Sequence, residues 1–229
     1  MEKMTITCDE VGQLLQFRDT AWWRLQLHRD ILSCHIAQDE YTGIISKACD
    51  YGKKMAAVWN EFSPCGSVEQ WLRLSGVEIR LINRIQAPPL VLFAAIMTNP
   101  LRIELYLDSI ARAFDALSAG AGYAELAGID KEAVKKIILA HECFHFLEDK
   151  CQKDYESYVV SYALGPLKRN SQIRQFSEVA AAVFAKDVCK IKFNPGILDA
   201  ALLSTFDSKK RGSERTAEKY IKALKAVES

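Results

Sequence analysis

Two histidines and a glutamate within residues 141–145, HECFH, are the side chains of this sequence best suited to chemistry. Residues four apart on an α-helix lie on the same face, so His141 and His145 can present two imidazoles to one metal ion. Glu142 lies about 100° further around the helix. That places it beside such an ion, where a carboxylate can take a proton from a metal-activated water. The H-E-x-x-H spacing therefore predicts a zinc site with Glu142 as the general base.

This spacing is rare for a chain of this composition. Only 4 of the 229 residues are histidine, and composition alone gives on the order of 0.005 matches in this length. Apolar residues, including Ile137 and Phe144, form a stripe beside the histidine face. A helix that is apolar on more than one side is buried, and buried histidines need polar partners. A metal ion would supply one, and hydrogen bonds from other core groups are the alternative.

A catalytic zinc needs a third protein ligand and an open position. Glu148 follows His145 by three residues, but three ligands in line along one helix fit a tetrahedron poorly. We therefore expect Glu148 either to hydrogen-bond to a ligand side chain without binding the ion itself, or to lie at the surface. Glu178, in QFSEVAAAVFA, lies on a separate stretch of small residues that could pack closely against the first helix. We predict Glu178 as the third ligand; the alternative is a carboxylate that only complements its own helix dipole.

Three tyrosines lie between the two candidate ligand segments. If residues 152–164 form a helix, Tyr155, Tyr158 and Tyr162 share one face of it. A tyrosine hydroxyl that reaches the zinc site could stabilise the oxyanion of an acyl-transfer transition state. Packing in the core or at the surface is the alternative role for all three.

The elements that must position these residues are mostly helical. Apolar residues at spacings of three and four predict helices over 9–60, 67–76, 109–127, 131–148, 152–164, 171–190 and 213–227. The sequence AGAG, residues 119–122, is expected to interrupt the third of these. Ser67 and Asp130 are the expected N-caps of the helices that follow them. Alternating residues predict strands at 77–85 and 101–108, and the apolar run 89–97 predicts a more buried strand. Strands grouped between helices indicate an α+β fold with a small three-stranded sheet and an N-terminal helical extension.

Composition and charge restrict the class of protein. The net charge of +1 gives no electrostatic argument for a nucleic-acid or membrane partner. The most apolar stretch, residues 87–97, is too short to span a bilayer, and the first residues contain no apolar secretory segment. The seven scattered cysteines, with no C-x-x-C pair, are typical of free thiols in a reducing compartment. We therefore expect a cytoplasmic protein.

The two candidate ligand segments together resemble a known family. HECFH, followed by Glu178, Ala181, Phe184 and Ala185 in the form E-x-x-A-x-x-F-A, is similar to the gluzincin class and most similar to the ImmA/IrrE-like metallopeptidases. The resemblance covers roughly residues 50–200. Two features depart from the family pattern: Phe144 stands where glycine is common, and the proline after the second motif is delayed to Pro195.

The resemblance implies a zincin-like fold, with Zn²⁺ held by His141, His145 and Glu178 and with Glu142 as base. It also implies a peptide or protein substrate, paired with an edge strand for which 101–108 is the candidate. The chain then divides into an N-terminal helical extension (1–60) packed on the core, a metallopeptidase domain (61–206) and a basic C-terminal helix or tail (207–229). The main hypothesis is a zinc metallopeptidase. The alternative is a non-catalytic zinc-binding regulatory or interaction protein that retains the site.

Overall fold

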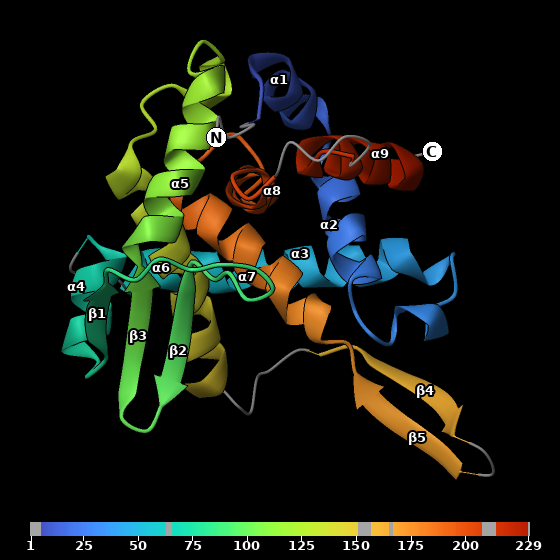
Figure 1. Cartoon of the computed structure of the whole chain (residues 1–229). Coiled ribbons are helices and arrows are strands. Elements are labelled where there is room, and N and C mark those ends of the chain that lie inside the picture. The colour runs from blue at the N-terminus through green and yellow to red at the C-terminus, as the bar shows by residue number, and fades with distance from the viewer. Residues whose placement is uncertain (1–5, 63–65, 151–156, 165–166, 208–213, 229) are drawn as a thin grey trace.

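The computed structural model describes residues 6–62, 66–150, 157–164, 167–207 and 214–228 (Figure 1). Its α-helices are α1 (Cys8–Gln16), α2 (Asp19–His28), α3 (Glu40–Phe62), α4 (Val68–Leu74), α5 (Leu107–Leu117), α6 (Lys131–Lys150), α7 (Arg174–Cys189), α8 (Gly196–Ser204) and α9 (Thr216–Glu228). Its strands are β1 (Glu78–Ile82), β2 (Ala94–Thr98), β3 (Leu101–Tyr106), β4 (Val159–Leu164) and β5 (Leu167–Gln172). The predicted α+β class, mostly helical with a small three-stranded sheet, is confirmed.

The three-stranded sheet has the order β1-β3-β2. β3 pairs in parallel with β1 and antiparallel with β2, so that Ile103 is opposite both Ile79 and Ile96. The expectation that residues 101–108 form an edge strand is therefore wrong, because β3 is central and buries Ile103 and Leu105 completely. β2 lies at an edge. It begins at Ala94, later than predicted, after the consecutive prolines 88 and 89, which have no N–H to donate to a ladder.

Small residues allow α7 to pack closely against both α3 and α6. Ala180 and Ala181 are fully buried on α7. A Cβ added to Gly52 of α3 would lie 2.5 Å from the backbone oxygen of Ala180, so no larger residue fits there without movement. The alanine-rich sequence that suggested close packing thus positions the helix that carries Glu178 against the helix that carries the two histidines.

The N-terminal segment is joined to α7 by polar contacts as well as by the core. Asp30, just after α2, accepts a 3.1 Å hydrogen bond from the backbone N–H of Gln175 in the first turn of α7. Asp19 of α2 pairs with Lys186 near the other end of α7. α9 packs against α2 and buries Tyr220 and Leu224. Buried apolar side chains from all three predicted segments, 1–60, 61–206 and 207–229, form one continuous cluster.

Local helix signals identified in the sequence are present in the structure. Ser67 Oγ accepts a hydrogen bond from the N–H of Gln70 and caps α4. Asp130 Oδ1 accepts a 2.7 Å bond from the N–H of Ala133 and caps α6. The predicted helix 9–60 is divided into α1, α2 and α3, and the predicted helix 109–127 ends at Leu117 and continues as two short 3₁₀ turns.

The predicted helix over residues 152–164 is wrong from residue 159 onward, and residues 152–156 lie outside the described part of the chain. β4 and β5 form an antiparallel hairpin that extends away from the helical body, with Tyr162 opposite Arg169 (Figure 1). Val159, Val160 and Tyr162 are residue types that favour strands, and pairing with β5 satisfies their backbone groups. Among the described residues, no helix is both long and apolar enough to cross a lipid bilayer.

Candidate metal centre

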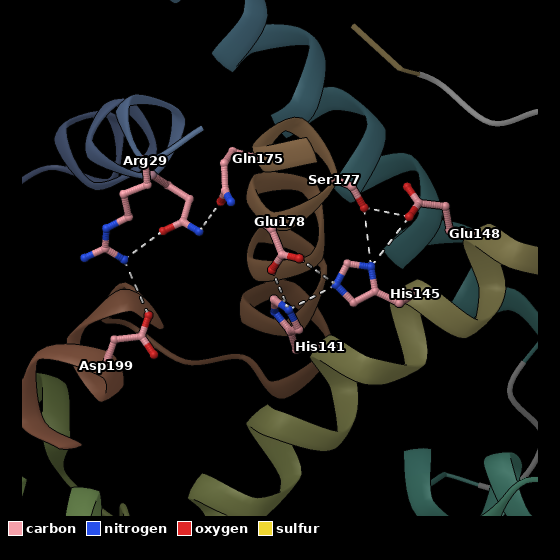
Figure 2. A network of polar contacts seen from close by, with 9 residues as sticks. Arg29, His141, His145, Glu148, Gln175, Ser177, Glu178 and Asp199 are labelled. Carbon is pink, nitrogen blue, oxygen red and sulfur yellow. Dashed lines mark hydrogen bonds and ion pairs between the residues drawn. The ribbon is translucent and has the colours of Figure 1, made fainter. Parts of the chain in front are cut away.

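His141 and His145 of α6 and Glu178 of α7 converge on one point (Figure 2). The Nε2 atom of His141 lies 3.1 Å from Oε2 of Glu178 and 3.2 Å from Nε2 of His145. His145 Nε2 lies 3.6 Å from the other Glu178 oxygen. Thus α6 supplies two potential ligand atoms one turn apart, and the neighbouring helix supplies the third.

These distances fit a tetrahedral ion. Ligand atoms about 2.0–2.1 Å from zinc lie about 3.3 Å from one another, and the three distances measured here are close to that value. Two imidazole nitrogens 3.2 Å apart would face each other with unshared lone pairs unless a proton or a metal ion lies between them. Two histidines and one carboxylate are also a donor set that zinc accepts. The residues present therefore fit a zinc ion.

Glu142 lies beside this cluster and not within it. It lines a cavity of about 200 Å³ together with His141 and Glu178. Within the described part of the chain, no hydrogen bond or ion pair holds its carboxylate. Cys143, the next residue, is completely buried, and that burial raises the pKa of its thiol. Adjacent residues of the same turn thus have opposite environments: Glu142 is available to a ligand in the cavity, whereas Cys143 belongs to the core.

Glu148 and Ser177 lie behind His145. Ser177 Oγ donates a 2.6 Å hydrogen bond to Glu148 Oε2, and it also lies 3.3 Å from Nδ1 of His145. The same Glu148 oxygen is 3.5 Å from this Nδ1. The other oxygen, Oε1, is buried without a hydrogen-bond partner among the described residues. Glu148 therefore lies at the far side of the imidazole, where it can orient the ring, and not in the ligand triangle.

The two central groups influence each other's ionisation. Burial alone would lower the pKa of His145, but the carboxylates of Glu148, Glu178 and Glu142 raise it to about 10. Burial alone would raise the pKa of Glu178, but hydrogen bonds from His141 and His145 hold that pKa well below its usual range. Without a metal ion, the carboxylate is thus charged and a proton on His145 provides the opposing charge.

The tyrosines expected near the site are not brought to it, as far as they are described. The Tyr158 hydroxyl donates a hydrogen bond to Glu40 of α3. Tyr162 lies on β4 and stacks on His35, with 5.0 Å between the ring centroids. Tyr155 lies outside the described residues. Neither Tyr158 nor Tyr162 contacts the cluster, which agrees with the alternative of packing, and residues 159–164 form β4 where a helix was expected.

Sequence reasoning missed the opposite wall of the cavity. This wall is formed by Gln26 of α2, by Arg29 at the C-terminal end of α2, and by Asp199 of α8. Arg29 lies 3.8 Å from Asp199, a pair separated by 170 positions in the chain. No spacing rule links such distant residues. Ser177 could have been found more easily, since it directly precedes the predicted ligand Glu178.

Comparisons with known proteins give no relative for this chain. No protein-family model matches it, and no curated protein and no solved structure is significantly similar to it.

Proposed function

We propose that this protein is a zinc-dependent metallopeptidase that hydrolyses peptide bonds. The single observation that carries the proposal is the convergence of His141, His145 and Glu178 from two helices at distances suited to one tetrahedral ion. Glu142 lines a cavity together with two of these residues, His141 and Glu178. Three protein ligands with space beside them are typical of catalytic zinc sites, whereas structural sites are closed by four.

Each residue of the site would have a distinct role in the reaction. When bound, zinc would supply a Lewis acid that polarises a carbonyl and lowers the pKa of water towards 7. His141, His145 and Glu178 would hold the ion. Glu142, with a carboxylate that no described residue engages, would accept the proton of the attacking water and then pass it to the leaving amine. Glu148 and Ser177 would keep the His145 ring in the orientation that directs Nε2 to the metal.

The family assignment and the location belong to this proposal. The resemblance of HECFH and the Glu178 segment to the gluzincin class, and to the ImmA/IrrE-like metallopeptidases in particular, supports a zincin-like site acting on a peptide or protein substrate. A cytoplasmic location agrees with the free cysteines, among which Cys8 and Cys34 are exposed.

Metal analysis of the purified protein is the first test. We expect close to one equivalent of zinc in the wild type and a large loss in His141→Ala. Asp149→Asn is a matched control, because Asp149 lies on the same helix but is exposed. Less than about half an equivalent of metal after incubation with zinc, unchanged by His141→Ala, would contradict the proposal.

Turnover is the second test. Glu142→Gln keeps the size of the side chain but cannot accept the proton, so it should retain zinc and lose cleavage of a mixed peptide library. We expect a loss of roughly a hundredfold or more, the usual contribution of general base catalysis. If the wild type binds zinc and cleaves no peptide in the library, the evidence favours the alternative of a non-catalytic zinc-binding regulator.

A further inference from the structure

The cavity lined by His141, Glu142 and Glu178 has its far side formed by segments outside the two ligand helices. α2 contributes Trp22 and Trp23, Pro195 contributes from the N-cap of α8, and α8 itself contributes Leu198. The lining is mostly apolar. Of the described residues that line it, Arg29 is the one lysine or arginine.

Arg29 is held in a defined position. Its Nη1 donates a 3.2 Å hydrogen bond to Oε1 of Gln26, and its guanidinium lies over the Tyr220 ring, 4.9 Å from the centroid. Asp199 Oδ2 is 3.8 Å from the same nitrogen, which is too long for a hydrogen bond. The Arg29 side chain remains 37% exposed. The fork of N–H groups is thus oriented and partly exposed in the lining of the cavity, and Figure 2 shows it facing Asp199.

The position of Arg29 is connected to the candidate metal centre through α7. Gln26 Nε2 donates a 2.5 Å hydrogen bond to Oε1 of Gln175. Gln175 precedes Glu178 by three residues, and residues three apart on a helix are neighbours on one face. α7 carries Glu178, the candidate third ligand, and through Gln175 it also holds Gln26, the partner of Arg29. The distance between Arg29 and Glu178 is therefore determined by the fold.

We propose that Arg29 is the anchor for a carboxylate of the substrate, which makes the enzyme selective for peptide bonds close to a carboxylate group; this inference rests on the proposed metallopeptidase function. A guanidinium presents paired N–H donors that match the two oxygens of a carboxylate. The cavity of about 200 Å³ is smaller than the roughly 300–1,000 Å³ of most ligand sites. It suits one residue, whose carboxylate is either the free C-terminus or an acidic side chain.

Small hydroxamates test the anchor without requiring turnover. Acetohydroxamate reports on the zinc alone. The monohydroxamates of malonic, succinic, glutaric and adipic acid add a carboxylate at increasing reach, and their monoamides are neutral controls. With zinc-loaded protein in a titration calorimeter, we expect at least one length to bind tenfold or more tightly as the carboxylate than as the amide. Arg29→Gln should abolish that preference and leave acetohydroxamate affinity within twofold. Arg29→Lys should retain part of it.

Arg24→Gln is the matched control, because Arg24 lies on α2, whose C-cap is Arg29, bonds to Gln38 and does not line the cavity. The inference is overturned if acetohydroxamate binds but no length shows the carboxylate preference, or if the preference survives Arg29→Gln. It is also overturned if ω-amino hydroxamates bind better than the amides and Asp199→Asn removes that gain, since Asp199 would then be the anchor. Failure of acetohydroxamate to bind would overturn the proposed function and this inference with it.

Peptides distinguish the two sources of the carboxylate. Wild-type cleavage is compared between free and amidated C-termini, and between glutamate and glutamine side chains near the scissile bond. A tenfold or larger rise in KM on amidation identifies the terminal carboxylate, and the same rise on Glu to Gln exchange identifies the side chain. Arg29→Gln should produce this rise in KM with little change in kcat. Equal KM values across all peptides would contradict the inference.

Discussion

Ser177 donates a 2.6 Å hydrogen bond to Glu148, and this bond joins α7 to α6 directly behind the candidate zinc ligands. Both side chains also approach Nδ1 of His145, at 3.3 and 3.5 Å. An imidazole whose Nδ1–H is engaged in this way keeps its Nε2 lone pair for a metal. The contact therefore defines the orientation of His145 before any ion binds.

Replacing Glu148 should weaken zinc binding without removing a ligand. We expect Glu148→Gln to raise the zinc dissociation constant about 10- to 100-fold, because an amide orients and polarises the His145 ring less well than a carboxylate. Competition against a chromogenic chelator measures the change. Glu132→Gln, in the exposed first turn of α6, is the control and should bind zinc like the wild type. Wild-type affinity in Glu148→Gln would show that the carboxylate does not support the ligand.

Removing Glu178 should have a larger effect than removing Glu148. Glu178→Ala deletes one of three candidate ligand atoms. We therefore expect a loss of zinc affinity greater than about a hundredfold, which exceeds the usual effect of removing a group that only hydrogen-bonds to a ligand. Asp187→Asn is the matched control, since Asp187 is exposed on the same helix. An affinity within about tenfold of the wild type in Glu178→Ala would mean that another group completes the site.

Features that depend on nearby residues could be predicted from the sequence. His141 and His145 are one helical turn apart, so their common face follows from helix geometry alone. The caps at Ser67 and Asp130 also depend on residues three positions away. Glu178 could be predicted because an acidic side chain directly precedes a run of small residues that suggested close packing, and the structure places its carboxylate beside both histidines.

Features that depend on distant residues could not be predicted in this way. Tyr158 and Tyr162 have a spacing that a helix would also give, and only pairing with β5 shows that the segment is extended. Arg29 and Asp199 approach each other because α2 and α8 meet at the cavity. That contact depends on how the helices pack around one core, which no local pattern encodes.

The stability of the metal-free protein should fall as the pH rises towards 10. The pKa of His145 is raised to about 10 in the folded chain, above its ordinary value of about 6.5. Its protonation therefore contributes stability that is fully present below about pH 6.5 and is lost as the pH rises through about 10. Thermal unfolding of chelator-treated protein between pH 6 and 10 measures this.

His145→Ala is the control for this pH dependence, and its melting temperature should change less over the same interval. Zinc should also flatten the profile of the wild type, because a bound ion replaces the proton between His145 and Glu178. A metal-free melting temperature that is equally pH-dependent in wild type and His145→Ala would assign the effect to other groups.

Two glycines of α3 should respond in opposite ways to the same substitution. In Gly52→Ala the new Cβ would lie 2.5 Å from the Ala180 carbonyl oxygen of α7, so the helices must separate; we expect a loss of roughly 1–3 kcal/mol in the free energy of unfolding. At Gly43 no atom of the described residues lies within 4 Å of the new Cβ. Gly43→Ala should therefore stabilise the protein by about 0.5–1 kcal/mol through helix propensity.

Urea unfolding of both variants measures these changes, and zinc affinity reports on the site. Because Ala180 is two residues after Glu178 on the same helix, a shift of α7 in Gly52→Ala should also displace the third candidate ligand and weaken zinc binding. Gly43→Ala should leave zinc affinity unchanged. If the two variants are equally stable and bind zinc equally well, the close approach of α3 and α7 does not control the position of Glu178.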